Sequence, residues 1–387
     1  MNVLAVISSA GIYGAESMLL NLLQELRSLG EQPVLAILRN SHHPNVELAD
    51  LARQRGLAVE VIPCQGRLDT SVPGRLRDCI RKYQIDVVHT HGYKADLYGY
   101  FATRRPKVPL VATCHNWTGV TASVSLYGRL DRLALRRFDR VAAVSDTVAQ
   151  ILLSARVPAD RLAVIPNGVP TKAFAARQTE RLDVLSGQSA PVIGMVGRLV
   201  KEKGFAYLLR GLRVLRERFP GTKCLIVGEG PQEMELRQCA SDEGVGEAVL
   251  FAGYCSDLPR VYHSMDVLVL PSFVEGMPMV VLEAMAAGKP VIATRVGAIP
   301  KLITPGQEGM LVEPGNTDAL VEALSCLLSN AEMQRSMGQR GQALVHQNYS
   351  ATVMAKRYLE FYSQAVPLMR IQPECAAQCL EDRVDVG

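Results

Sequence analysis

VLVLPSFVEGMPMVVLEAMAAGKPVIATRVGAIP, residues 267–300, is the most informative stretch of this chain. It begins with a four-residue apolar run, Val267–Leu270, which is closed by Pro-Ser and predicts a buried parallel strand. Pro278 suits the first turn of a helix, where a missing N–H costs nothing, and Gly288 follows the expected last turn. Residues 290–294 predict the next buried strand. The stretch therefore predicts a strand–loop–helix–strand unit of a parallel α/β sheet.

The loop and the helix start in this unit carry two carboxylates, Glu275 just before the helix and Glu283 inside it. Backbone N–H groups at a helix start have no partner within the helix, and a helix N-terminus preceded by glycine is a common anion site. Glu283 lies one turn after Met279, so its side chain should point back toward the same loop. This arrangement suits a ligand with a diphosphate in the middle and hydroxyl groups at both ends, as in a nucleotide sugar.

A simpler interpretation of the two carboxylates is that both are solvated residues at a helix start, where acidic side chains are favoured. It fits Glu275 as well as a ligand contact does. It fits Glu283 less well, because the surrounding run MVVLEAMAA is otherwise apolar. A charge inside an apolar helix needs a partner or a cavity.

The chain has 387 residues, which fits two domains of common size. Its hydrophobic fraction of 48% and charged fraction of 21% are typical of a soluble globular protein. We expect neither a signal peptide, because the N-terminus has no basic segment, nor a membrane-spanning helix. The nine cysteines are scattered singly, which favours reduced thiols and a cytoplasmic location. Cys375 and Cys379 lack the further ligands of a zinc site, so no metal site is expected.

Positive charge is concentrated in the first half of the chain. Residues 1–170 contain 20 Lys and Arg against 14 Asp and Glu, whereas the remainder is slightly acidic. This suggests that the first half meets an anionic partner. One helical stretch interleaves apolar residues with Arg129, Arg132, Arg136, Arg137 and Arg140. It could lie on an anionic membrane surface, and a solvated helix packed on the sheet explains the pattern equally well.

Strands and helices alternate along the first half, which predicts a parallel α/β sheet. The first strand, residues 2–8, leads through a loop with Gly14 into a helix. This is the geometry by which doubly wound sheets approach phosphate, although the spacing is not G-x-G-x-x-G. The other strands are expected at residues 32–38, 58–62, 87–90, 110–113, 140–144 and 162–165.

Polar clusters follow three of these strands, at the edge where open α/β sheets bind ligands. They are Thr90-His91-Gly92-Tyr93-Lys94, Thr113-Cys114-His115-Asn116-Trp117 and Ser145-Asp146. His115 comes directly after the strand that ends in VAT and is the strongest candidate for contact with a substrate. An ordinary loop histidine with satisfied hydrogen bonds would also fit its position.

A turn, IPNGVP at residues 165–170, closes the first half, and residues 171–190 are expected to be a linker. The next strand, residues 192–196, precedes Arg198 and Lys203, which lie on either side of a turn before a helix from Phe205. A guanidinium fork and an ammonium group could converge there on a diphosphate. Alternatively, both are exposed surface charges.

The rest of the second half continues the α/β pattern. Further strands are expected at residues 224–227, 249–251 and 310–312, and a helix at 318–328. A last helical segment, residues 351–366, has an apolar face, and the residues after Pro367 resemble a frayed tail.

Taken together, the motifs resemble the retaining glycosyltransferases of family 4. The resemblance covers about residues 1–365 and rests on motifs in the family's order: GAE at 14–16, VIPNGV at 164–169, GMVGRLVKEKGF at 194–205, VGEGP at 227–231, FAGY at 251–254 and PSFVEGMPMVVLEAMAAGKPVIAT at 271–294. It implies an α/β fold of the GT-B type, with two facing Rossmann-like domains, a cleft between them and a C-terminal helix crossing back to the first. The implied acceptor domain is residues 1–170 with 351–387, and the implied donor domain is residues 191–350.

The resemblance also implies roles for the candidate residues. Arg198 and Lys203 would hold the donor diphosphate, and His115 would lie near the reacting carbon of the sugar. Glu275 would bond hydroxyls of the transferred sugar, and Glu283 would bond the ribose. The other implied donor-binding residues are Gly14, Gly197, Cys255, Gly276, Met277, Pro278, Met279 and Val280.

One position departs from the family pattern. The family commonly has two glycines before Ala-Glu, whereas Tyr13 takes the first place here. Tyrosine lacks the φ freedom of glycine and adds bulk on the acceptor side. The contacts of this loop are therefore harder to predict than those of the donor side.

The expected reaction is transfer of a hexosyl unit from a UDP- or GDP-sugar to an acceptor hydroxyl, with retention and without a metal or cofactor, because Arg198 and Lys203 can neutralise the leaving group. The expected acceptor is a saccharide or lipid-linked saccharide of cell-surface polysaccharide, lipopolysaccharide or glycolipid, and not a nucleic acid. The protein would be cytoplasmic and could bind peripherally to the inner face of the membrane. The alternatives are a GT-B epimerase, hydrolase or phosphorylase, a dinucleotide oxidoreductase, and a non-catalytic subunit that binds nucleotide sugars.

Overall fold

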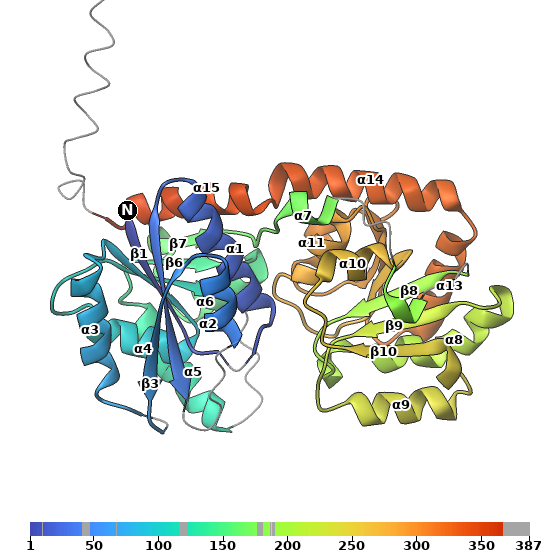
Figure 1. The fold of residues 1–387 in the computed structure, drawn as a ribbon, viewed down its shortest axis with the longest axis horizontal. Coiled ribbons are helices and arrows are strands. Elements are labelled where there is room, and N and C mark those ends of the chain that lie inside the picture. Colours follow the sequence, from blue (N-terminus) through green and yellow to red (C-terminus); the bar gives the residue numbers. More distant parts are fainter. Residues whose placement is uncertain are drawn as a thin grey trace, which may run out of the picture.

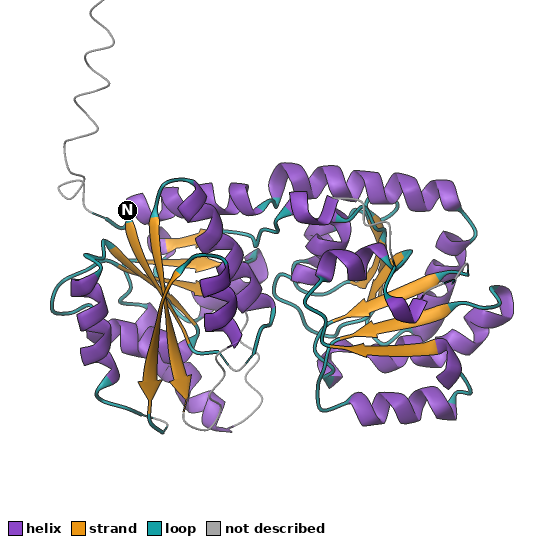
Figure 2. Cartoon of the chain, in the orientation of Figure 1, coloured by secondary structure: helices purple, strands orange, loops and turns teal. Residues whose placement is uncertain are grey.

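Two parallel sheets with helices on both faces organise the protein (Figures 1 and 2). The computed structural model describes residues 1–9, 11–40, 47–66, 68–115, 122–175, 181–185, 187 and 190–366, with only the backbone of 122–127 and 129. The first sheet has the order β3-β2-β1-β4-β5-β6-β7 and the second β10-β9-β8-β11-β12-β13. Each is a doubly wound, Rossmann-like sheet, which confirms the expected fold class.

The first sheet consists of the seven strands that the apolar runs predict, with small shifts at their ends. They are β1 (Asn2–Ile7), β2 (Gln32–Asn40), β3 (Ala58–Cys64), β4 (Val87–His91), β5 (Leu110–Cys114), β6 (Arg140–Ala143) and β7 (Leu162–Val164). Its helices are α1 (Gly14–Ser28), α2 (Glu47–Gln54), α3 (Val72–Lys82), α4 (Tyr93–Ala102), α5 (Ala122–Leu135) and α6 (Asp146–Ser154), with a 3₁₀ turn η1 (Ala159–Arg161). Residues 3–7 of β1 are buried on both faces, which explains why this strand is a continuous apolar run rather than an alternating one.

The second sheet contains β8 (Val192–Val196), β9 (Lys223–Val227), β10 (Val249–Gly253), β11 (Val267–Leu270), β12 (Val291–Thr294) and β13 (Gly309–Val312). Its helices are α7 (Thr171–Ala175), α8 (Phe205–Arg218), α9 (Glu233–Asp242), α10 (Leu258–His263), α11 (Met279–Ala286), α12 (Ile299–Leu302), α13 (Thr317–Leu328) and α14 (Ala331–Asn348), with 3₁₀ turns η2 (Asp183–Leu185), η3 (Lys201–Lys203) and η4 (Gly246–Ala248). The unit β11–α11–β12 forms as predicted. Gly288 follows the last turn of α11 with a φ of 69°.

Helix α14 was not predicted from the sequence. It has few apolar residues and two glycines, Gly338 and Gly341, which ordinarily weaken a helix. The structure gives the glycines a packing role, because a Cβ at Gly338 would lie 2.0 Å from the carbonyl oxygen of Gly288. A Cβ at Gly341 would lie 3.1 Å from Cγ of Met285 on α11. The small residues therefore let α14 approach α11 closely.

The chain crosses between the two sheets at two adjacent places. Val169 N–H donates to the Tyr349 carbonyl at 3.0 Å, and Ala351 N–H donates to the Val169 carbonyl at 2.8 Å. From there α15 (Ala351–Ser363) packs on the first sheet, where Tyr358 and Tyr362 are fully buried. Figure 1 shows α14 over the second sheet and α15 over the first, along one side of the molecule. This confirms the expected return of the C-terminal helix, whereas the expected tail lies outside the described residues.

The basic helix predicted in the first half is α5. The helix ends at Leu135, earlier than the arginine pattern predicts, so Arg136 and Arg137 follow it and Arg140 begins β6. Arg136 Nε donates to the Ala155 carbonyl at 2.9 Å, and the Arg140 guanidinium carbon lies 5.5 Å from the Phe361 ring centroid. On the outside, Leu130 and Leu133 are 43% and 49% exposed. The surface thus combines charged and apolar residues, and contact with a membrane stays a prediction. Within the described residues, no helix has the length and apolar character that a membrane crossing needs.

Candidate functional site

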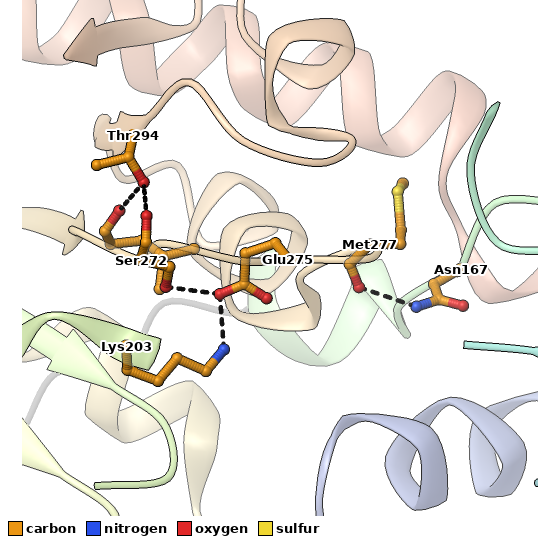
Figure 3. A network of polar contacts seen from close by, with 7 residues as sticks. Asn167, Lys203, Ser272, Glu275, Met277 and Thr294 are labelled. Atoms are coloured by element: carbon orange, nitrogen blue, oxygen red, sulfur yellow. Dashed lines mark hydrogen bonds and ion pairs between the residues drawn. The ribbon is translucent and has the colours of Figure 1, made fainter. Parts of the chain in front are cut away.

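The loops after β8 and β11 bring Lys203 and Glu275 together (Figure 3). Lys203 Nζ donates to Glu275 Oε1 at 2.6 Å, and the two side chains are 22% and 8% exposed. Ser272 Oγ donates to the same carboxylate oxygen at 2.7 Å. Glu275 is therefore not a solvated residue at the helix start, and Lys203 is not an exposed surface charge. The two are the centre of a buried polar cluster.

Backbone contacts hold the two loops against each other. Phe273 N–H donates to the Glu202 carbonyl at 2.7 Å. Gly204 has a φ of 66°, and a Cβ there would lie 2.1 Å from the Pro271 carbonyl oxygen, so only glycine fits this position. Thr294 Oγ1 donates to the Ser272 carbonyl from the end of β12 (Figure 3). The position of Lys203 relative to Glu275 is thus set by the backbone.

Helix α11 begins directly after these residues, and Pro278 is its N-cap with a φ of −73° and a ψ of 114°. Gly276, Met277, Pro278 and Met279 are buried, and Val280 is partly exposed. Within the described part of the chain, no hydrogen bond is made by the backbone N–H groups of Gly276, Met277, Met279 or Val280. Unpartnered N–H groups at a helix start favour an anion, so the expected anion site is present in geometry.

Residues of the first domain reach this helix start. Asn167, from the predicted IPNGVP turn, donates its side-chain amide to the Met277 carbonyl at 3.1 Å (Figure 3). Gly14 begins α1, and a Cβ there would lie 3.5 Å from Cγ of Met279. The N-termini of α1 and α11 therefore lie next to each other, as a ligand held between the two sheets requires.

Arg198 follows Gly197, which has a φ of 147° and packs under Gly228, whose Cβ would lie 2.0 Å from the Gly197 carbonyl oxygen. Unlike Lys203, Arg198 is exposed, and its side chain makes no hydrogen bond or ion pair with any residue that the structure describes. Its guanidinium carbon lies 5.4 Å from the ring centroid of Tyr13. All five of its N–H donors are therefore available to a ligand.

Glu283 lies inside α11 with 5% of its surface exposed. Its partner is Tyr262 on α10, whose hydroxyl donates to Glu283 Oε2 at 2.7 Å. The pKa of Glu283 is raised to about 7. Burial is the larger cause and raises the pKa, whereas the hydrogen bond from Tyr262 acts against it and lowers the pKa. The carboxylate thus has a protein partner, and the buried apolar setting makes its charge costly.

His115 forms a contact with the neighbouring strand end. His91 Nδ1 and His115 Nε2 lie 3.1 Å apart, and their rings are stacked with centroids 5.4 Å apart. Burial lowers the pKa of His115 to about 4, so the imidazole is neutral near pH 7. His115 makes no hydrogen bond or ion pair with Arg198, Lys203 or Glu275. Asn116 and Trp117 of the predicted cluster lie outside the described residues.

Behind this pair, a buried polar network reaches the C-terminal helix. His89 Nδ1 lies 2.7 Å from the Tyr362 hydroxyl, and His89 Nε2 lies 2.7 Å from Thr113 Oγ1. Thr113 Oγ1 in turn lies 2.8 Å from the Tyr358 hydroxyl. Helix α15 is therefore tied by side chains to the strands that carry His91 and His115.

Cys255 follows β10 and is half-buried, with its Sγ 3.9 Å from the Asp257 carbonyl oxygen. It lies apart from the Lys203–Glu275 cluster and makes no hydrogen bond with it. Each cysteine that the structure describes is a free thiol, and Cys375 and Cys379 are not among them. No set of three metal-ligating side chains is found in the described ranges.

The site therefore offers two cations, an unpartnered helix N-terminus and a buried carboxylate for hydroxyl groups. The sequence model "Glycosyltransferase Family 4" matches residues 12–173, and "Glycosyl transferases group 1" matches residues 176–344. A GDP-mannose-dependent phosphatidylinositol monomannoside mannosyltransferase of Mycolicibacterium smegmatis is 32% identical over 320 residues, which cover 76% of this chain and 81% of the relative. This chain is a family 4 glycosyltransferase.

Two further comparisons agree with this assignment. A phosphatidyl-myo-inositol mannosyltransferase of the same organism is 29% identical to this glycosyltransferase and covers 90% of this chain and 89% of its own. The crystal structure of Anabaena HepE in complex with UDP-glucose superposes with a TM-score of 0.82 at 22% identity, over 94% of this chain and 99% of that one. The resemblance found in the sequence, including the GT-B fold, is confirmed.

Sequence reasoning on this glycosyltransferase missed four residues of the site: Asn167, Ser272, Tyr262 and His91 as a partner of His115. The His91–His115 pair was within reach, because both residues end adjacent parallel strands. Asn167 lay in a recognised motif without a role. Tyr262 gave no signal, because an aromatic residue in a short helix is usually part of the core.

Proposed function

We propose that this enzyme transfers a hexosyl unit from a nucleotide diphosphate sugar to an acceptor hydroxyl with retention of the anomeric configuration. The observation that carries the proposal is the buried Lys203–Glu275 pair next to the unpartnered N–H groups at the start of α11. A diphosphate suits the cations and the helix N-terminus. A sugar suits Glu275, whose second carboxylate oxygen makes no hydrogen bond within the described residues.

In the proposed reaction, the bond between the anomeric carbon and the diphosphate oxygen breaks, and its electron pair stays on the diphosphate. Arg198, Lys203 and the N-terminus of α11 stabilise the negative charge that develops there. The acceptor oxygen then bonds to the anomeric carbon on the same face, and its proton passes to the leaving phosphate oxygen. Because two side-chain cations can neutralise the leaving group, we propose that the reaction proceeds without a metal ion.

The remaining candidates take supporting roles in this proposal. Glu283 bonds the ribose, the backbone near Cys255 meets the base, and Gly14 and Gly197 allow the backbone to approach the phosphates. His115 acts near the reacting carbon as a neutral hydrogen-bonding imidazole rather than as a cation, since burial keeps its pKa at about 4. The domain boundaries expected from the sequence, 1–170, 171–190 and 191–350, fit these roles.

For the acceptor, we propose a lipid-linked or growing saccharide of the cell surface, used at the inner face of a membrane. The two mannosyltransferase relatives are named for phosphatidylinositol-based acceptors. The first half of this chain has an excess of Lys and Arg, which favours an anionic lipid surface. UDP- and GDP-sugars are both retained as donors, because the HepE structure contains UDP-glucose and the mannosyltransferase relative is named for GDP-mannose.

The test is a thermal-shift panel of UDP-, GDP- and ADP-sugars on the purified protein in the presence of EDTA. A donor should raise Tm with one nucleotide family, and Glu283→Ala should abolish that shift. With this donor, Arg198→Ala and Lys203→Ala should lower kcat by about 10²–10³-fold and weaken donor binding much less, because their main role is in the transition state.

Three results would contradict the proposal. A donor that binds only after a divalent metal is added would remove the proposed metal independence. Release of free sugar and nucleotide at the full rate without an acceptor would favour an epimerase or hydrolase. A complete lack of binding would favour a non-catalytic subunit.

A further inference from the structure

The ring of Tyr13 lies between the two sheets, where it packs against a residue of its own loop and contacts Arg198 of the second domain. A Cβ at Gly11 would come within 2.9 Å of the Tyr13 ring, so the glycine leaves the space that the ring occupies. Tyr13 N–H donates to the Glu16 carboxylate at 3.1 Å, which holds the residue at the N-cap of α1. Its φ of −121° is extended backbone, so tyrosine at this position carries no conformational strain.

Arg198 of the second domain lies over this ring. Its guanidinium carbon is 5.4 Å from the ring centroid, which is within the range of a cation–π contact. Tyr13 is 44% exposed, and Arg198 is exposed with a side chain that makes no hydrogen bond or ion pair with the described residues. Among the described residues, the Tyr13 ring is thus the recorded side-chain contact of this guanidinium.

The contact of Arg198 with the Tyr13 ring is not a hydrogen bond to any described residue, so the N–H donors of the guanidinium stay available. The guanidinium has five N–H donors, and contact with the Tyr13 ring leaves them able to bond phosphate oxygens. A free arginine side chain loses much rotational freedom when it binds an anion. A ring that already restrains it lowers that loss, which is preorganisation in the usual sense.

We propose that Tyr13 is a positioning residue for the donor site: its ring holds Arg198 across the two domains with the N–H edge directed to the donor diphosphate. This inference rests on the proposed function, because it takes the diphosphate as the ligand of Arg198. It also gives the departure from the family's glycine pattern a role. Tyr13 belongs to the loop before α1 in the proposed acceptor domain, and its ring acts on Arg198 in the proposed donor domain.

The experiment is a double-mutant cycle on the full chain, read as the Kd of the nucleoside diphosphate selected by the donor panel and of inorganic pyrophosphate. Tyr13→Leu removes the ring and should weaken binding by about 2–5-fold, which corresponds to the usual strength of an exposed cation–π contact. Tyr13→Phe keeps the ring and should bind as the wild type does. In an Arg198→Met background, Tyr13→Leu should have no further effect.

Two more variants separate positioning from general damage. Gly11→Ala should displace the ring without removing it and should weaken binding as Tyr13→Leu does. Tyr100→Leu is the matched control, because Arg104 lies over Tyr100 at the same 5.4 Å within the first domain, and its loss should leave the Kd unchanged. Circular dichroism and Tm of each variant show whether it is folded.

The inference is overturned if Tyr13→Leu binds as tightly as the wild type or more tightly, since the ring would then be neutral or an obstacle. It is also overturned if Tyr13→Leu weakens binding equally in the Arg198→Met background, because the ring would then act without Arg198. A wild type that binds no nucleoside diphosphate and no pyrophosphate overturns the proposed function, and the inference with it. The first two results leave the proposed function intact.

Discussion

Replacing Glu283 with glutamine should make the protein more stable than the wild type at pH 8 but not at pH 5. Burial raises the pKa of Glu283 to about 7 from an ordinary value of 4.5. Between these two values, the folded protein holds a proton that the unfolded chain has lost. Stability from this group is therefore fully present below pH 4.5 and is lost as the pH rises through 7.

The size of the effect follows from that window. One pKa unit corresponds to about 1.4 kcal/mol, so the shift from 4.5 to about 7 corresponds to about 3 kcal/mol. Glutamine has a similar shape, accepts the Tyr262 hydrogen bond and cannot ionise, so its variant should show no such loss. At pH 5 the variant should match the wild type or fall about 1–2 kcal/mol below it, because its amide donors are buried without partners.

Urea unfolding followed by circular dichroism at pH 5 and pH 8 measures this difference, and hydrogen exchange of α11 amides assigns the transition to the second sheet. Glu322→Gln on the exposed side of α13 is the control, and it should change the unfolding free energy by the same amount at pH 5 and pH 8. A difference between Glu283→Gln and the wild type that is the same at both pH values would refute the reasoning. Glu283→Gln should also bind the donor more weakly, because we propose that the Glu283 carboxylate accepts hydrogen bonds from the ribose and an amide accepts them less strongly.

Three further predictions follow from the site. Lys203→Met leaves the buried Glu275 carboxylate with one donor fewer, so it should lower unfolding free energy by about 1–3 kcal/mol in addition to its effect on turnover, as urea unfolding can measure. Gly204→Ala should unfold the enzyme at clearly lower urea than Gly244→Ala, because both have similar φ, 66° and 68°, but only Gly204 lies against another backbone; equal midpoints would contradict this. Burial lowers the pKa of His115 to about 4, so His115 should not cause an inflection near pH 6.5 in the pH–rate profile. The wild type and His115→Gln should therefore have profiles of the same shape around pH 6.5.

The strands and the β11–α11–β12 unit could be predicted because their signals are local. A parallel strand buried on both faces is a short continuous apolar run, and β8 and β11 form where such runs occur. Helix α14 could not be predicted in this way. Its glycines weaken the local signal, and their role is visible only when the carbonyl of Gly288 is placed against Gly338.

The candidate site divides along the same line. Arg198, Lys203 and Glu275 could be selected from sequence because charges next to glycines at strand ends are informative. Glu283 could be selected because a charge inside an otherwise apolar helix needs a partner or a cavity. That Lys203 and Glu275 bond each other depends on the pairing of β8 with β11, since 72 residues separate them. That Arg198 meets Tyr13 depends on how the two sheets face each other, which no local pattern contains.

Within the described residues, the polar contacts that join the two sheets near the site include one buried hydrogen bond, from Asn167 to the Met277 carbonyl, and others between exposed side chains. Lys301 and Asp146 form an ion pair with side chains that are 66% and 52% exposed, and Thr147 Oγ1 lies 3.5 Å from the Gly297 carbonyl oxygen. Exposed pairs of this kind contribute about 0–1 kcal/mol each. The covalent and backbone connection is concentrated instead where Val169 pairs with Tyr349 and Ala351. A donor that bridges Arg198 to the first domain would add a further contact between the two sheets and would stabilise the arrangement in which they face each other.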